Sequence, residues 1–299
     1  MSETPIARRV LEAMRRQMGS KVANLEAFRA GKAQAEAMQR SVATPESLQG
    51  SHPAHARYAY VQNQMSVMAE QLLELDEMRI FAKLIGEANH EYVPSWPPMS
   101  PITTSYFWCW SNLDLAANAH RETLGSVIVR VATAFGVHPN LLAMMKTFND
   151  SRMGLYRVEA LTDGGLQLVD LVTAERCAAI CESGHPGAVG ELWFTRVLPP
   201  SMPGSAEPVV FTSPYILIAP DEARWVRYLD RIAAQDPKRP RSAVLERHFK
   251  WGPSRRYWTE FVFEGYVNHR PGAIYLKGLP DIPASRPHSP EYVRHADGH

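Results

Sequence analysis

The most regular hydrophobic pattern in the chain runs from residue 61 to residue 75. Apolar residues recur there in alternating steps of four and three, and a seven-residue repeat turns one stripe of a helix towards a partner helix. The next position in strict register is the charged Arg79, and the stripe continues one residue early through Met78, Ala82 and Ile85. Such a shift disfavours a long regular coiled coil. The pattern predicts one helix over residues 60–90, with a heptad stripe formed by Val61, Met65, Met68, Leu72, Leu75 and Met78.

An earlier helix is predicted to cover this stripe. Pro5 suits its first helical position, where a missing N–H costs nothing. Apolar residues then recur every three or four positions over residues 11–28, although Lys21 interrupts them. We therefore expect a long helical hairpin of residues 5–40 and 60–90. Because the two stripes match imperfectly, two interpretations stay open: the heptad stripe is covered within its own domain, or part of it also pairs with a second chain.

The remaining residues of the first half are expected to complete a helical domain of residues 1–150. Four prolines between residues 94 and 101 forbid a regular helix, so this segment is expected to wrap across the domain and bury its aromatic residues. Ser111 can cap a helix that ends near Gly136. Pro139 then suits the start of a shorter helix.

The second half of the chain changes to short β-rich runs separated by glycine- and proline-containing turns. This pattern predicts a small antiparallel β-sheet or a partly open barrel, with C-terminal helices, in a domain of residues 151–299. The fold class is therefore α+β. The predicted strands are 155–159, 166–172, 191–198, 208–218 and 273–276, the predicted helices are 220–235 and 254–269, and a loose tail follows residue 279.

Residues 142–228 resemble the β-rich region of bacterial SEC-C-motif-containing proteins. The segments that carry the resemblance are Asp150–Val158, Gly165–Thr173 and Gly190–Pro200. The resemblance implies a strand–turn–strand module that follows a helix, in proteins that mostly act as accessory factors. The zinc motif that defines the family, Cys-x-Cys with a later Cys-His, is absent from this sequence, so the resemblance implies no metal site.

The composition is that of a globular protein: 45% of the 299 residues are hydrophobic and 21% are charged. The 32 basic residues nearly balance the 31 acidic ones, so net charge favours neither nucleic acid nor an acidic partner. The sequence has no apolar run long enough for a membrane span, and its first residues lack the apolar core of a signal peptide. Three cysteines cannot all pair. We therefore expect a cytoplasmic protein.

Metal binding has only weak candidates. Cys177, Cys181 and His185 are spaced by four, which would align three soft ligands on a helix, whereas structural zinc takes four. Gly184 and Pro186 flank the histidine and disfavour a helix there. Buried thiols that pack as small hydrophobic groups are the alternative. We therefore predict no metal and no cofactor.

Paired carboxylates give no stronger signal. Glu87 and His90 have the spacing used in di-iron bundles, but such bundles need a second pair and further glutamates. The dipeptide Pro280-Asp281 lacks the following acidic residue and lysine of a nuclease motif. Glu260 and Glu264 are expected to lie on an exposed helix face, where Arg256 can pair with one of them. Walker, Rossmann, serine-hydrolase and zinc-protease motifs are absent from the sequence. No catalytic residue is therefore predicted.

A basic and aromatic stretch over residues 238–258 offers a surface for single-stranded nucleic acid, because cations neutralise phosphates and aromatic rings stack on bases. A solvated loop or an acidic protein partner would explain the same composition. The residues that we expect to contact nucleic acid in the first case are Arg247, Lys250, Trp251, Arg255 and Arg256.

Three functions follow from the sequence. The leading prediction is a non-catalytic cytoplasmic interaction or scaffold protein that associates with itself or another protein through the heptad stripe. The alternative is a nucleic-acid-binding accessory protein that uses residues 238–258. The third is an enzyme whose site is assembled from scattered residues.

Overall fold

The computed structural model describes residues 5–21, 52–92, 106–200, 207–252, 266–270 and 273–277. These residues belong to two compact units. The helical unit comprises residues 1–85 and 116–150, and the barrel unit comprises residues 86–115 and 151–299. No helix in the described ranges is both long and apolar enough to cross a membrane.

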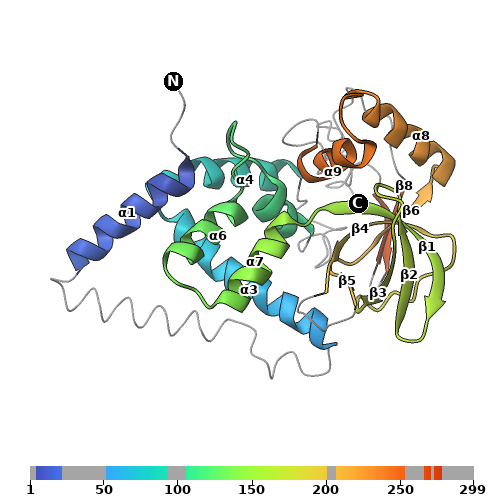
Figure 1. Cartoon of the computed structure of the whole chain (residues 1–299), viewed down its shortest axis with the longest axis horizontal. Helices are drawn as coiled ribbons and strands as arrows, with labels where there is room; N and C mark the ends of the chain where they lie inside the picture. Colours follow the sequence, from blue (N-terminus) through green and yellow to red (C-terminus); the bar gives the residue numbers. More distant parts are fainter. Residues whose placement is uncertain are drawn as a thin grey trace, which may run out of the picture. The chain divides into compact units, whose positions relative to one another are not determined.

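The helical unit is built on α6 (Leu124–Ala134), which lies among the other helices of this unit in Figure 1 and buries Leu124, Val127, Ile128 and Val131. Thr123 caps α6 by accepting a hydrogen bond from the Ser126 N–H, while the Ser126 hydroxyl oxygen accepts one from the Thr123 N–H. Gly136, with a φ of 71°, follows its end as predicted. The other elements here are α1 (Ile6–Lys21), α3 (Pro53–Leu73), η1 (Asp76–Met78), the start of α4 (Arg79–Tyr92) and α7 (Pro139–Asp150).

The predicted N-terminal hairpin is wrong. Helix α1 packs against α6 and η1, whereas α3 packs against α6 and α7. The physical reason is that α6 buries Val127, Ile128 and Val131 and so offers a broader apolar surface than the interrupted stripe of α1. The part of the predicted first helix that follows residue 21 lies outside the described residues.

The single helix predicted over residues 60–90 is also wrong. Leu75 has an extended backbone, with φ −78° and ψ 140°, and separates α3 from η1 and α4. The break falls where the hydrophobic repeat shifts register. After it, Phe81 is buried and Ala82 is exposed, so the stripe does not continue as the pattern predicted.

The barrel unit contains a closed five-stranded barrel, which corrects the prediction of an antiparallel sheet or partly open barrel. Strand β1 pairs with both β2 and β4, so the order β1-β2-β3-β5-β4 closes on itself. Strands β3 and β5 are parallel and pair through two residues each. The sequence pattern did not predict β3. The strands of the ring are β1 (Met153–Thr162), β2 (Gly165–Asp170), β3 (Arg176–Cys181), β4 (Leu192–Leu198) and β5 (Val209–Val210).

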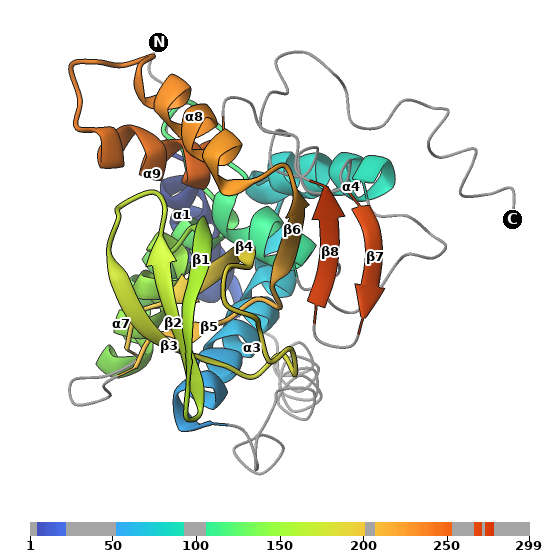
Figure 2. The same ribbon diagram turned by 90° about the vertical axis from the view of Figure 1, so that its right-hand side faces the viewer.

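Three further strands extend the sheet from β4, and Figure 2 shows them side by side. The order is β6 (Tyr215–Ala219), β8 (Ala273–Lys277) and then β7 (Tyr266–Arg270) at the edge. Residues 266–269 were predicted to end a helix, but they belong to β7, so that prediction is wrong. Residues 254–265 lie outside the description.

Two helices and a helical turn belong to the same unit. Helix α8 (Glu222–Ala233) starts at Asp221, whose carboxylate accepts a hydrogen bond from the Arg224 N–H, and it packs against α9 (Arg241–Trp251). The turn begins at residue 106 and ends as η2 (Trp110–Asp114), so the continuous helix predicted from Ser111 to about residue 135 is wrong.

Candidate functional site

Arg196 lies in β4, the strand that the barrel shares with the extended sheet. Alternate residues of a strand point to opposite sides. Trp193 belongs to the hydrophobic core of the barrel, so Phe194 and Arg196 project from the other side of the strand. The side chain of Arg196 is 0% exposed. A fully buried arginine requires compensating partners.

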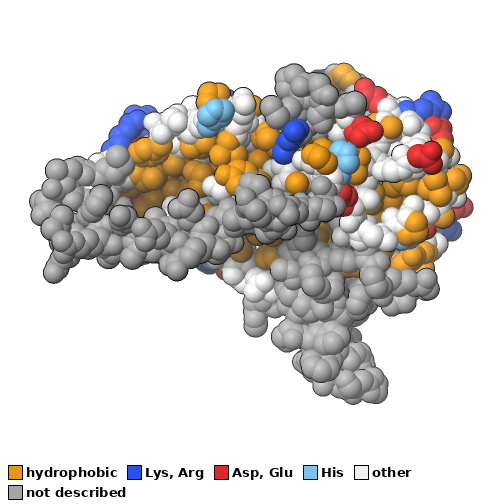
Figure 3. Space-filling model, turned by 90° about the horizontal axis from the view of Figure 1, so that it is seen from below, with side chains coloured by type: hydrophobic (Ala, Val, Ile, Leu, Met, Phe, Trp, Pro, Cys, Tyr) orange, Lys and Arg blue, Asp and Glu red, His pale blue; other side chains and the backbone are white. Residues whose placement is uncertain are grey.

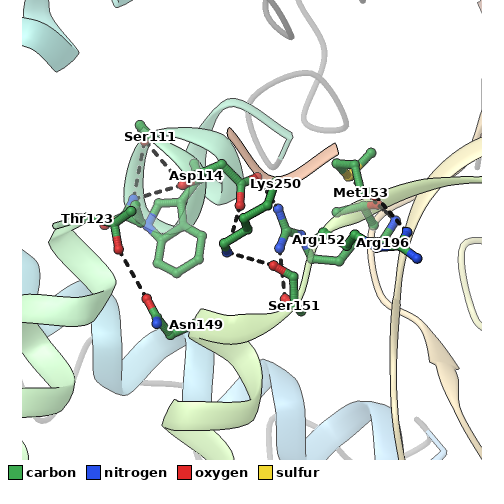
Figure 4. A network of polar contacts seen from close by, with 12 residues as sticks. Ser111, Asp114, Thr123, Asn149, Ser151, Arg152, Met153, Arg196 and Lys250 are labelled. Carbon is green, nitrogen blue, oxygen red and sulfur yellow. Dashed lines mark hydrogen bonds and ion pairs between the residues drawn. The ribbon is translucent and has the colours of Figure 1, made fainter. Parts of the chain in front are cut away.

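Two residues of the barrel unit, Asp114 and Ser151, supply these partners, and Lys250 binds the same two residues. The Arg196 Nη2 donates to Asp114 Oδ2, and its Nη1 donates to Ser151 Oγ at 2.8 Å. Lys250 Nζ donates to Asp114 Oδ1 at 2.9 Å and to the Ser151 carbonyl oxygen at 2.7 Å (Figure 4). We call Asp114, Ser151, Arg196 and Lys250 the charge cluster.

The charge cluster joins segments that are far apart in the chain. Asp114 ends η2, Ser151 links α7 to β1, and Lys250 lies in the last turn of α9. The Asp114 side chain is 3% exposed and that of Lys250 is 10% exposed. Asp114 therefore divides one negative charge between two buried cations.

A second ion pair lies next to the cluster in sequence. Arg152 Nη2 donates to Asp170 Oδ2 at 2.8 Å, and Asp170 Oδ1 accepts a hydrogen bond from the Val172 N–H at 2.8 Å. The guanidinium of Arg152 also lies over the Phe249 ring, 6.0 Å from its centre. Because Arg152 has its own carboxylate, it does not compete for Asp114.

The groups beside the charge cluster remain protonated at neutral pH. Burial raises the pKa of the Cys109 thiol to about 12, and burial also raises the pKa values of the Tyr106 and Tyr215 hydroxyls. A buried neutral thiol is a poor nucleophile. The Tyr106 and Tyr215 rings meet edge to face with centroids 5.1 Å apart. These groups can donate hydrogen bonds but supply no reactive anion.

A buried histidine connects α8 and α9. His248 Nε2 and the Tyr228 hydroxyl lie 2.8 Å apart. Burial lowers the pKa of His248 to about 4, so its ring is neutral at pH 7. The contact joins the two helices, and Lys250 follows His248 by two residues on α9.

The predicted metal candidates are not aligned. Cys177 and Cys181 lie on a strand, where residues four apart are separated by roughly 13 Å. His185 follows in a loop, where its Nε2 is 3.0 Å from Glu191 Oε2. Within the described ranges, no three His, Cys, Asp or Glu residues gather as metal ligands. Glu87 is described but the side chain of His90 is not, and Glu260, Glu264 and Asp281 lie outside the description.

Three cations of the basic stretch are paired with carboxylates of the barrel unit. Arg239 pairs with Asp236, and Arg241 pairs with Asp230. Lys250 belongs to the charge cluster and lies over the Trp251 ring, 5.5 Å from its centre. Of the expected contact residues, Arg247 is exposed and Trp251 is half-buried, whereas Arg255 and Arg256 lie outside the description.

Most of the heptad stripe is inaccessible. Val61, Met65, Leu72 and Met78 are buried, and only Met68 and Leu75 are half-buried. Hydrophobic side chains also gather on the face of the helical unit shown in Figure 3. Among the described residues of this unit, the large hydrophobic ones that are more than a third exposed are Tyr60, Ile80 and Phe135. Such single exposures are common on soluble proteins and assign no function.

Sequence reasoning missed the charge cluster. Arg196 is the one charged residue in the apolar run that forms β4, and this was the available signal. Asp114 was placed inside a predicted helix, and Lys250 was assigned to phosphate contact. Nothing in the sequence indicates that residues 114, 196 and 250 meet. The chain matches no protein-family model, no curated protein and no solved structure.

Proposed function

We propose that the protein is a non-catalytic interaction protein that self-associates by adding the β7 strand of one copy to that of another. The observation that carries this proposal is the edge position of β7. Within the described strands, β7 has β8 as its single neighbour. The backbone groups along the other side of an edge strand can pair with another strand.

A second copy is the partner that the strand itself favours. The sequence Tyr266–Arg270 carries one formally charged residue, Arg270. Two copies paired antiparallel about Asn268 would place each Arg270 opposite a Tyr266, so like charges would not meet. Such a pairing has twofold symmetry, which is the commonest symmetry of soluble oligomers.

The polar residues at the candidate site support a structural role there. Asp114, Arg196 and Lys250 are buried, and the half-buried Ser151 accepts hydrogen bonds from both cations. Catalytic acids, bases and nucleophiles need access to a substrate. A cluster of this kind instead joins α9 and η2 to the barrel.

The nucleic-acid alternative receives less support. Small barrels that bind oligonucleotides use the outer face of two neighbouring strands. On β2 and β3, the exposed cation Arg176 pairs with Glu159 at 2.8 Å. Lys250, which was expected to contact phosphate, is buried with Asp114. A cytoplasmic location is part of our proposal, and the three free cysteines accord with a reducing compartment.

Proline substitutions at neighbouring positions of β7 test the proposal. Successive N–H groups of a strand point to opposite edges, so one of Asn268 and His269 directs its N–H towards β8 and the other directs its N–H away. Proline removes that N–H. Of Asn268→Pro and His269→Pro, we expect one to lower the unfolding temperature and the other to leave it nearly unchanged.

The mass of each variant is then measured by light scattering. The native chain should gain mass as its concentration rises, and the stable proline variant should stay monomeric. The destabilised variant serves as the control for a damaged sheet. A native chain that is monomeric at every concentration, or a stable variant that associates as the native chain does, would contradict the proposal.

A further inference from the structure

Positive charge is concentrated on the pair of helices α8 and α9. Residues 222–251 contain eight Lys and Arg residues and four Asp and Glu residues, a formal net charge of +4 in a chain whose total is +1. Three of the four carboxylates are already engaged, because Glu222, Asp230 and Asp236 each form an ion pair with an arginine. An excess of cations therefore remains on these helices.

Three of the cations lie on one face of α8. Arg224, Arg227 and Arg231 follow one another in steps of three and four residues, which places them within about 60° of one another around the helix and within about 10 Å along its axis. All three are exposed, whereas Trp225 and Tyr228 between them are buried. We call the three arginines the arginine face.

The arginine face is open to a partner. Within the described part of the chain, neither Arg224 nor Arg227 forms an ion pair. Arg231 interacts with another group of the protein, but a guanidinium has five N–H donors and a single contact does not exhaust them. Figures 1 and 2 both show α8 at the outer edge of the barrel unit.

The composition of α8 decides what kind of partner fits. Protein interfaces are built around apolar and aromatic side chains, and no large hydrophobic side chain of α8 is exposed. A helix that lies in a bilayer surface needs an accessible apolar face, and that of α8 is buried in the barrel unit. Contacts to the phosphates of nucleic acid need only cations. Single strands are also bound by exposed aromatic rings, which α8 lacks, so a duplex fits better.

We propose that the arginine face binds the phosphate backbone of duplex DNA without reading its base sequence. Phosphates of one strand follow one another about every 3.4 Å along the duplex axis, so the 10 Å of the face span about three of them. The major groove of DNA, about 12 Å wide, admits a helix, whereas that of duplex RNA is too narrow. This face lies outside the stretch 238–258 that the sequence analysis assigned to nucleic acid, and the proposal does not depend on strand addition at β7.

Fluorescence anisotropy of a labelled 20-base-pair DNA duplex, titrated with the full chain, tests the proposal. Two duplexes of unrelated sequence should bind with the same affinity. The logarithm of the affinity should fall with the logarithm of the salt concentration with a slope of about −2.7, for three phosphate contacts. The double variant Arg224→Gln/Arg227→Gln should bind about tenfold more weakly, with a slope reduced by about 2.

The matched control is Arg15→Gln/Arg16→Gln, which removes the same charge from exposed positions of α1 and should bind DNA as the native chain does. Both variants should keep the native unfolding temperature, because only exposed helix positions change. No binding of the duplex at low salt would overturn the proposal, and so would an equal loss of affinity in the two variants. Tighter binding to vesicles of anionic lipid than to DNA, lost in Arg224→Gln/Arg227→Gln, would assign the face to a membrane surface instead and overturn it as well.

Discussion

At the scale of single residues, Asp114 is the acceptor that holds Arg196 and Lys250 in the interior of the barrel unit. Asp114→Asn should destabilise the fold by about 3–5 kcal/mol, because removal of one partner leaves buried charge uncompensated. Urea unfolding measures the loss. Glu159→Gln is the matched control, since it breaks an exposed pair with Arg176 and should change stability little. Equal effects of the two substitutions would refute a central role for Asp114.

His248 is expected to make stability depend on pH. Its pKa is about 4 in the folded state, against an ordinary value of 6.5, because burial disfavours the charged ring. The unfolded chain therefore binds the proton more readily. The contribution of His248 to the free energy of unfolding is complete above pH 6.5. It is lost as the pH falls towards 4, and the loss is on the order of 3 kcal/mol.

Unfolding free energies at pH 7 and near pH 5 measure this effect. The variant His248→Gln should lose much of the dependence, whereas His120→Gln, at an exposed position, should keep it. A full pH dependence in His248→Gln would show that other groups cause it.

At the scale of elements, the hydrophobic stripe of α3 shows most clearly what a sequence pattern can predict. It predicted which residues are buried, but not which helices cover them. The spacing of four and three correctly marked Val61, Met65 and Leu72 as buried. It could not show that α6 and α7 cover them, because several apolar helices compete for the same surface. The break at Leu75 coincides with the register shift of the hydrophobic repeat, although a register shift alone does not distinguish a helix end from a continuing helix.

Two methionines of α3 distinguish a role in the hydrophobic core from a role in contacting another chain. Met65 is 0% exposed, whereas Met68 is half-buried. Met65→Lys should destabilise the fold by several kcal/mol, since it buries a charge without a partner. Met68→Lys should remain folded. Circular dichroism during heating distinguishes the two, and similar unfolding temperatures would contradict the burial of Met65.

The same pair tests the interaction predicted for the heptad stripe. If this helix also contacts a second chain, Met68→Lys should lower the mass of the associated species without unfolding it. An unchanged mass would confine self-association to other surfaces.

Helix α1 begins against a carboxylate from elsewhere in the helical unit. Glu122 accepts hydrogen bonds from the Ile6 N–H at 2.7 Å and the Ala7 N–H at 3.1 Å. Negative charge at a helix N-terminus is favourable. Glu122→Ala should weaken α1 by about 1–3 kcal/mol, for lost charge-assisted hydrogen bonds. Hydrogen exchange in α1 should accelerate in this variant. Glu70→Ala, at an exposed position on α3, is the control and should leave exchange in α1 unchanged. Unchanged exchange in the Glu122→Ala variant would contradict the role of Glu122 as the cap of α1.

At the scale of the whole molecule, closure of the barrel was the feature that local patterns could not predict. Strands β1, β2, β4 and β6 could be predicted from the β-rich runs, because their apolar residues alternate or cluster between turns. Closure depends on β1 pairing with β4 and on two residues of β5 beside β3. Such pairings are set by long-range packing. The charge cluster depends on the same packing, which explains why its members could not be associated beforehand.

Self-association through the outer side of β7 can be tested by hydrogen exchange of the native chain at low and high concentration. Strand addition buries the outward N–H groups of residues 266–270 between two copies. We expect slower exchange in this strand at high concentration, with β2 unchanged as an internal reference. Exchange in β7 that is independent of concentration would contradict self-association through this edge.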